Sequence, residues 1–357
     1  MKGRNLKEYL LALLVSVLLA LVLGGVIMAA SGFNPIDGYA LMVKGAVGKP
    51  RLIGDTLAKS ATLCLTGLAT AIAAKAGIFN VGGEGQLYLG AMASAIVGAK
   101  LTGVSPIIGV PLCLLAAALA GAAYAYVPGV LKVKLKVDEV VTTILLNSAA
   151  IYFCSYLANG PLKTMDRGVN SGTDKVDPAF MFERLIRSSS LTESIFIAAI
   201  IAFVVWYIMR KTTLGYGMQL TGQNARFSRY AGIASDRLAI GSMAASGAIC
   251  GLVGMFEVFG LHKRFITSVS QEFYYDGMLV AMIMRYNPVG IILLSLVFGA
   301  MQIGGKDMES SAGIPSSIVI IIQSILIFCM AAEEGFLRSF KAWRNKKNAA
   351  LTLRKEG

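Results

Sequence analysis

The chain is poor in the residues that most enzymes use for catalysis. It has one histidine, His262, and its five cysteines stand singly in apolar segments without a CxxC pair. Metal and redox centres usually need clustered cysteine and histidine, so neither is expected here. With so few candidate bases, hydrolytic chemistry and an intramembrane enzyme are both disfavoured.

Charged residues are also scarce. Only 15% of the 357 residues are charged and 56% are hydrophobic. Several apolar stretches reach the roughly 20 residues that a helix needs to cross a bilayer. The net charge of +13 lies in the tails and connections, which is typical of membrane orientation and not of nucleic-acid binding. The composition therefore predicts an all-α polytopic membrane protein. We expect it to contact membrane lipid and not to bind nucleic acid.

The apolar runs predict about ten transmembrane segments, some of them broken or re-entrant. They cover approximately 9–30, 56–76, 87–101, 106–127, 138–158, 191–209, 238–261, 277–284, 289–303 and 314–332. Lys59 and Lys75 lie near the ends of the second run, where long side chains can snorkel. Pro128 opens a connection, and Asp138 suits the start of the next helix.

Lysine and arginine are divided unevenly between the connections. With a cytoplasmic N-terminus, the inner pieces (1–8, 128–139, 210–237 and 338–357) hold 18 basic residues in 68 positions, and the outer pieces hold 11 in 88. Cytoplasmic loops carry the excess of these residues in membrane proteins. We therefore expect both termini in the cytoplasm.

The stretch 77–86, Gly-Ile-Phe-Asn-Val-Gly-Gly-Glu-Gly-Gln, interrupts two apolar runs with glycines and polar side chains. Discontinuous helices of this kind are where transporters place substrate and coupling sites. Glu84 either lies near the pathway or a gate, or caps the helix that starts there. Phe79, Asn80 and Gln86 either contact a small polar or aromatic solute or pack helices together.

A second break, Arg285-Tyr286-Asn287-Pro288, echoes the first. In both halves an aromatic–Asn pair precedes an apolar run that ends in Gly-Ala-Met, at 90–92 and at 299–301. Paired interruptions of this kind predict two pseudo-repeated halves, 56–158 and 238–332. Arg285 and Asn287 are therefore further pathway candidates, although Arg285 could instead anchor the chain at a membrane surface.

The connection 210–237 contains a short polar helix between two glycines, Gly222 and Gly232. Arginines beside exposed aromatics are typical anchors for the groove of a protein partner, and a solvated basic loop is the alternative. The candidate contacts of this segment are Gly222, Gln223, Asn224, Arg226, Phe227, Arg229 and Tyr230.

Three pieces carry a specific resemblance: GIFNVGGEGQLYLGA, LTGQNARFSRYAGI and RYNPVGIILLSLVFGAMQIGG. In this order they resemble the permease subunits of ATP-binding-cassette importers, in the branched-chain amino acid and ribose permease superfamily and nearest to its nucleoside branch. The resemblance covers roughly residues 56–305. It implies a non-enzymatic subunit of a bacterial cytoplasmic membrane that translocates nucleosides, purine or broader, by ATP-driven alternating access.

The resemblance also implies three protein partners. A cytoplasmic ATP-binding subunit would receive the coupling helix at 222–232, and a second permease, similar but not identical, would pair with the chain. An extracellular lipoprotein of the basic membrane protein type would deliver the solute. This chain would carry no cofactor or metal, and ATP and Mg would bind the partner ATPase. The sequence accordingly holds no GxxxxGK[ST] motif.

Alternatives remain within the superfamily and outside it. Simple sugars and riboflavin-like solutes are the alternative substrates. An ion-coupled secondary carrier would work alone and would need an essential membrane carboxylate, either Glu84 or Glu257. A purely structural membrane subunit is disfavoured because it would not need two polar breaks.

Overall fold

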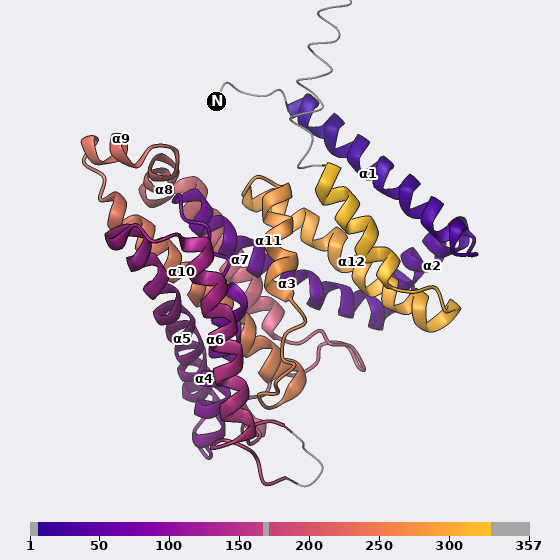
Figure 1. Cartoon of the computed structure of the whole chain (residues 1–357). Coiled ribbons are helices and arrows are strands. Elements are labelled where there is room, and N and C mark those ends of the chain that lie inside the picture. Colours follow the sequence, from indigo (N-terminus) through magenta and orange to yellow (C-terminus); the bar gives the residue numbers. More distant parts are fainter. Residues whose placement is uncertain (1–5, 167–170, 330–357) are drawn as a thin grey trace, which may run out of the picture. The chain divides into compact units, whose positions relative to one another are not determined.

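The computed structural model describes residues 6–166 and 171–329, and all regular structure in these ranges is helical except one isolated bridge between Arg184 and Thr192. The helices, in chain order (Figure 1), are α1 (Leu6–Ala30), α2 (Pro35–Val47), α3 (Pro50–Lys75), α4 (Gly83–Lys100), α5 (Pro106–Leu135), α6 (Glu139–Asn159), η1 (Pro178–Phe180), α7 (Ser194–Lys211), α8 (Thr213–Gln223), α9 (Ala225–Tyr230), α10 (Ser235–Glu257), η2 (Val258–His262), α11 (Phe273–Ile283) and α12 (Pro288–Ala312). A further apolar helix covers Ser317–Cys329.

Six of the described helices are long and apolar enough to cross a membrane: α3, α5, α6, α7, α10 with η2, and α12. Val15–Ala30 and α2 form a pair bent by 115°, which would make a seventh span. The all-α, multi-span prediction is thus confirmed. The count of about ten segments and the two half repeats stay predictions.

Several predicted helix boundaries differ from the structure, and two of them have a clear physical reason. The connection expected from residue 128 is wrong over 128–135, because α5 continues to Leu135 with Pro128 inside it. Pro128 and Gly129 are buried, and Gly129 packs beside Met243 of α10, so tertiary packing outweighs the proline. α4 begins at Gly83 instead of residue 87, because Glu84 and Gln86 in its first turn have hydrogen-bond partners inside the protein.

By its internal contacts the chain divides into two compact units, residues 1–46 with 301–357 and residues 47–300. In the first unit the hydroxyl of Tyr39 donates a hydrogen bond of 2.5 Å to the carbonyl of Leu21, which fixes α2 against α1. Gly24 gives room for Ile322 of the helix Ser317–Cys329. The predicted tail 338–357 and the first five residues of the tail 1–8 lie outside the described residues.

The second unit is built around α10, which packs against α3, α4 and α5. Small residues make this packing close. A Cβ at Gly251 would collide with the Ala117 carbonyl of α5, and one at Gly90 of α4 would collide with Gly251 itself. Helices in lipid associate mainly through such close contacts, because lipid removes the hydrophobic driving force between them.

The second unit has two distinct ends. In Figure 1, α8 and α9 lie at one end of the bundle formed by α4, α5, α6 and α10, and the connection between α6 and α7 lies at the other. That connection is tied down by Arg264, which donates a 2.7 Å hydrogen bond to Asp166. The same hydrogen bond holds the pKa of the Asp166 carboxyl below its usual value.

We predict that Gly251→Val lowers the thermal stability of the purified protein. The branched side chain must displace the Ala117 backbone, and overpacking of this kind costs about 1–3 kcal/mol. Gly241→Val is the matched control on the same helix, because no atom lies within 4 Å of a Cβ built there. Thermal unfolding in detergent measures both variants, and equal melting temperatures would contradict the packing described here.

Candidate functional site

The stretch 77–86, which we call the break, separates the end of α3 from the body of α4. α3 ends at Lys75, and Gly77 then takes a left-handed conformation (φ +83°) that turns the chain. The Asn80 side chain accepts a 2.9 Å hydrogen bond from the Gly82 amide and closes a local turn before α4. The break is therefore an ordered structure and not a loose linker.

Asn80 and Gln86 form a reciprocal pair inside the bundle. The Asn80 amide nitrogen donates to Gln86 Oε1 at 2.9 Å, and Gln86 Nε2 donates back to Asn80 Oδ1 at 3.1 Å. Asn80 also donates to Ser246 Oγ of α10 at 2.9 Å. Both side chains are buried, whereas Phe79 is half-buried. The two amides thus hold the break and α10 together.

Glu84 caps a different helix from the one expected. Its carboxylate accepts a 3.1 Å hydrogen bond from the Tyr274 amide, in the first turn of α11 and 190 residues away in the chain. The hydroxyl of Tyr274 in turn donates to the carbonyl of Asn80 and accepts from Thr70 of α3 at 3.2 Å. The start of α4 and the start of α11 are therefore joined by direct hydrogen bonds.

Asn147 of α6 completes this junction, although it is not among the site residues predicted from the sequence. Its Oδ1 accepts a 2.7 Å hydrogen bond from the Gly85 amide, and its Nδ2 donates to the Val81 carbonyl at 2.8 Å and to Tyr275 Oη at 2.9 Å. The available signal was an asparagine in the middle of an apolar helix. Together, Asn80, Glu84, Gln86, Asn147 and Tyr274 form what we call the junction.

A second polar group lies between α3, α10 and α11. Thr62 Oγ1 donates to the Glu257 carboxylate at 3.1 Å, and Lys59 Nζ lies 3.8 Å from the centroid of the Phe273 ring. The charge of Lys59 also acts on Glu257. Lys59 is the tenth residue of α3 and not near its end, because α3 begins at Pro50 and not at residue 56 as expected. Lys59, Thr62 and Phe273 were not among the predicted site residues.

Arg285 and Asn287 lie in the turn between α11 and α12. Both are exposed, and Arg285 and Tyr286 have positive φ angles of 50° and 59°. The Asn287 side-chain oxygen accepts from Arg210 at the end of α7 at 2.8 Å and from the Val289 amide at 3.3 Å. The element that meets the first break is thus the start of α11, twelve or more residues before Asn287.

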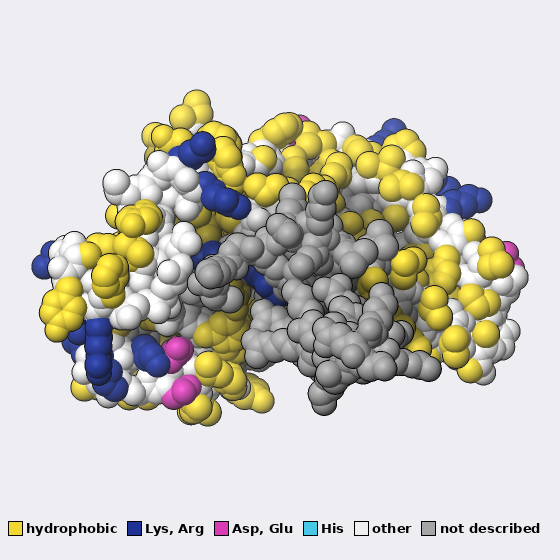
Figure 2. All heavy atoms as spheres, turned by 90° about the horizontal axis from the view of Figure 1, so that it is seen from above, with side chains coloured by type: hydrophobic (Ala, Val, Ile, Leu, Met, Phe, Trp, Pro, Cys, Tyr) yellow, Lys and Arg dark blue, Asp and Glu magenta, His cyan; other side chains and the backbone are white. Residues whose placement is uncertain are grey.

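The segment 222–230 is exposed at the end of the bundle that carries α8 and α9. Tyr230 is 91% exposed and Phe227 is 59% exposed. Asn224 caps α9 by accepting a 3.0 Å hydrogen bond from the Phe227 amide, and Arg229 pairs with Asp236 at 2.5 Å. Figure 2, which looks onto this end, shows basic side chains beside hydrophobic ones on the part of the molecule that carries these helices.

Gly222 connects this exposed segment to the break. A Cβ at Gly222 would collide with the Lys75 carbonyl and would lie 3.1 Å from the Gly77 amide nitrogen. The end of α8 is therefore in direct contact with the last residue of α3, next to the start of the break. A displacement of α9 would reach the break through backbone contacts, without a long chain of side chains between them.

Membrane-length helices, a polar junction enclosed among them and an exposed short helix at one end together define a multi-pass membrane protein of the transport class. The family model described as "Branched-chain amino acid transport system / permease component" matches residues 52–331. The chain belongs to this permease family.

Three curated relatives are similar over most of the chain. The guanosine ABC transporter permease protein NupP of Bacillus subtilis is 32% identical over 91% of this chain and 94% of its own length. The nucleoside ABC transporter permease protein NupB of Lactococcus lactis is 34% identical over 92% of each chain. The glucose ABC transporter permease protein TsgB13 of Haloferax volcanii is 29% identical over 91% of this chain and 87% of its own. No solved structure matches the chain significantly.

We predict that Glu84→Ala destabilises the protein, whereas Glu84→Gln keeps most of its stability. Alanine leaves the Tyr274 amide without its acceptor, which costs about 1–3 kcal/mol in a buried site, but glutamine still offers a carbonyl oxygen. Thermal unfolding in detergent measures the effect, with Glu183→Ala in an exposed connection as the control. An unchanged melting temperature for Glu84→Ala would show that the cap contributes nothing.

Proposed function

We propose that this chain is the transmembrane permease subunit of an ABC importer that carries nucleosides across a bacterial cytoplasmic membrane. One observation carries the choice of substrate: two relatives named as guanosine and nucleoside permeases are 32% and 34% identical over more than nine tenths of the chain. The fold supports the class, because helices of membrane length surround a polar break.

ATP hydrolysis belongs to a separate cytoplasmic subunit in this proposal. α9 supplies the docking element, because Arg226, Phe227 and Tyr230 are exposed together at one end of the bundle. Gly222 then passes a displacement of α9 to the end of α3. The junction links that point to α4, α6, α10 and α11 through hydrogen bonds, so the helices around the pathway would change their positions together.

The solute contacts we propose lie beside the junction and not within it. Asn80 and Gln86 satisfy each other, which supports a scaffold role for both. The half-buried aromatic side chains of Phe273 and Tyr275 offer faces on which a nucleobase can stack. Lys59 and Glu257 supply polar groups for ribose hydroxyls. Glu84 of α4 accepts a hydrogen bond from the Tyr274 amide, which lies between these two residues, and so holds the start of α11 in place.

The remaining partners complete the transporter. A second permease, similar but not identical, would pair with this chain, and an extracellular lipoprotein of the basic membrane protein type would deliver the solute. Both termini would be cytoplasmic, in agreement with the distribution of lysine and arginine. Alternating access then requires that ATP binding favours one orientation of the pathway over the other.

A sugar is the second candidate substrate, because one relative is named as a glucose permease. Competition separates the two candidates. In vesicles that contain this chain with its partner permease and ATPase, we expect excess unlabelled guanosine to abolish uptake of labelled guanosine and excess glucose to leave it unchanged. Inhibition by glucose at the same concentration would favour the sugar.

We predict that Arg226→Glu abolishes ATP-driven uptake and leaves membrane insertion intact. The substitution reverses a charge on the exposed face of α9 without removing a described hydrogen bond of the fold. The measurements are nucleoside uptake and co-purification of the ATPase, with Arg187→Glu at the opposite end of the bundle as the matched control. Normal uptake by Arg226→Glu would rule out α9 as the coupling element.

An ion-coupled carrier predicts the opposite behaviour of the isolated chain. We expect this chain alone, reconstituted in vesicles, to show no nucleoside uptake under proton or sodium gradients, since the driving force enters through α9. Vesicles without the protein provide the control, and gradient-driven uptake by the chain alone would establish the carrier.

A further inference from the structure

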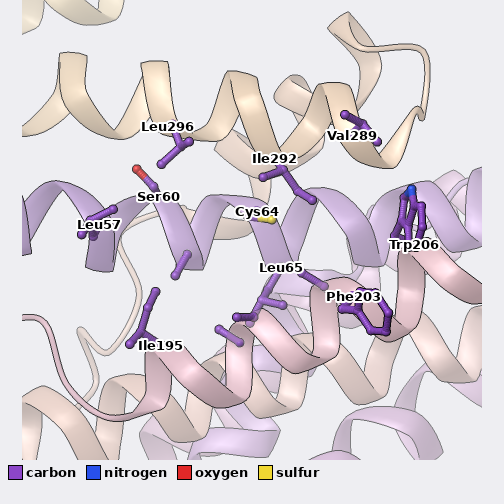
Figure 3. Close-up of a pocket in the computed structure, with 14 residues that line it drawn as sticks. Leu57, Ser60, Cys64, Leu65, Ile195, Phe203, Trp206, Val289, Ile292 and Leu296 are labelled. Carbon is purple, nitrogen blue, oxygen red and sulfur yellow. The ribbon is translucent and has the colours of Figure 1, made fainter.

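A cavity of about 520 Å³ lies between α3, α7 and α12, away from the junction. Figure 3 shows side chains of all three helices directed into it, with Leu57 and Ile195 at one end and Trp206 and Val289 at the other. The lining side chains are apolar except for Ser60, Cys64 and Trp206, and the last two are nearly apolar. The Ser60 hydroxyl donates a 2.6 Å hydrogen bond to the Thr56 carbonyl.

The shape of the cavity suits a single hydrocarbon chain. The eleven helical steps from Ile195 to Trp206 of α7 give it a length of about 16 Å. Its wall on α7 is partly made of alanines, and Ala199 is exposed at its edge. Phe196, Ile200 and Val204 of the same helix are exposed hydrophobic residues. In a helix of membrane length, an apolar surface of this kind is suited to contact lipid.

The two ends of the cavity differ in charge. Beyond Trp206, α7 ends in Arg210 and Lys211, and Arg210 lies close enough to Lys75 of α3 for their charges to interact. Val289 lies next to the turn at which Asn287 accepts one hydrogen bond from Arg210. A guanidinium has five donors, so this bond leaves capacity for a phosphate. Near Leu57 and Ile195, by contrast, the neighbouring charged residues are acidic: Asp55 is two residues before Leu57 and Glu193 is two residues before Ile195.

We propose that this cavity binds one acyl chain of an anionic phospholipid whose phosphate is held by Arg210. Apolar walls accept the chain, the basic end selects the charge of the headgroup, and Trp206 lies between them, where an indole ring suits the membrane interface. The lipid would fill the space between α7 and α12 and hold the end of α7, from which α8 and α9 follow.

The fluorescence of Trp206 can report on the cavity, because the chain has only two tryptophans. In a Trp343→Phe background, the full chain is reconstituted in phosphatidylcholine vesicles that contain a small fraction of lipid brominated on its acyl chains. We expect brominated phosphatidylglycerol to quench Trp206 about fivefold more effectively than brominated phosphatidylcholine at the same fraction, which is the selectivity that one basic residue supplies near a membrane surface. Equal quenching by the two lipids would overturn the proposal.

Two variants locate the site. Ala199→Phe fills the cavity and Arg210→Gln removes the headgroup partner, so each should abolish the difference between the lipids. Ala149→Phe, on an exposed face of α6, and Arg187→Gln, in the connection before α7, are the matched controls and should preserve it. If both test variants keep the selectivity, the lipid binds elsewhere and the proposal is wrong.

The same reporter tests the alternative occupant, which is a helix of the partner permease. If a partner covers the cavity, Trp206 in the assembled transporter is shielded from both brominated lipids, although it is quenched in the isolated chain. That result would replace the lipid with a protein contact and overturn the proposal. Circular dichroism and the melting temperature of each variant confirm that a lost signal does not come from unfolding.

Discussion

Backbone amides at the start of a helix need acceptors, and in an apolar interior water cannot supply them. α4 and α11 both begin inside the second unit, so each exposes unsatisfied N–H groups there. Asn147 accepts from Gly85 of α4, and Glu84 accepts from Tyr274 of α11. The polar residues of the break are thus required by the backbone, and the surrounding helices are arranged around this requirement.

This constraint explains why the break carries glycines as well as polar side chains. The ring of Tyr274 occupies the space where a Cβ of Gly83 would lie, and the backbone of Asn147 approaches Gly85 to about the limit of contact. Without side chains at these positions, α4, α6 and α11 come close enough for their hydrogen bonds. The same device recurs at Gly222, where α8 rests on the end of α3. In the mechanism that we propose, structural and coupling roles therefore share one set of backbone contacts.

The sequence predicts the helical class, the break itself and a short polar helix between Gly222 and Gly232, because periodicity, glycines and capping residues are local signals. It does not predict which helix Glu84 caps, since its partner Tyr274 lies 190 residues away. The echo between the two breaks directs attention to Asn287, yet the helix start that meets Glu84 lies at Phe273. The roles of Asn147 and Lys59 depend on packing between helices that no local pattern encodes. Pro128 likewise predicts a helix end that burial against α10 overrides.

Hydrogen exchange at the first turn of α11 measures directly whether Glu84 satisfies an amide across the junction. An amide in the first turn of a helix normally lacks an intrahelical acceptor and exchanges quickly. We expect the Tyr274 amide to exchange as slowly in the native protein as amides deeper in α11, to exchange fast in Glu84→Ala and to be protected again in Glu84→Gln. Fast exchange in the native protein, or protection that survives Glu84→Ala, would show that Glu84 does not satisfy this amide.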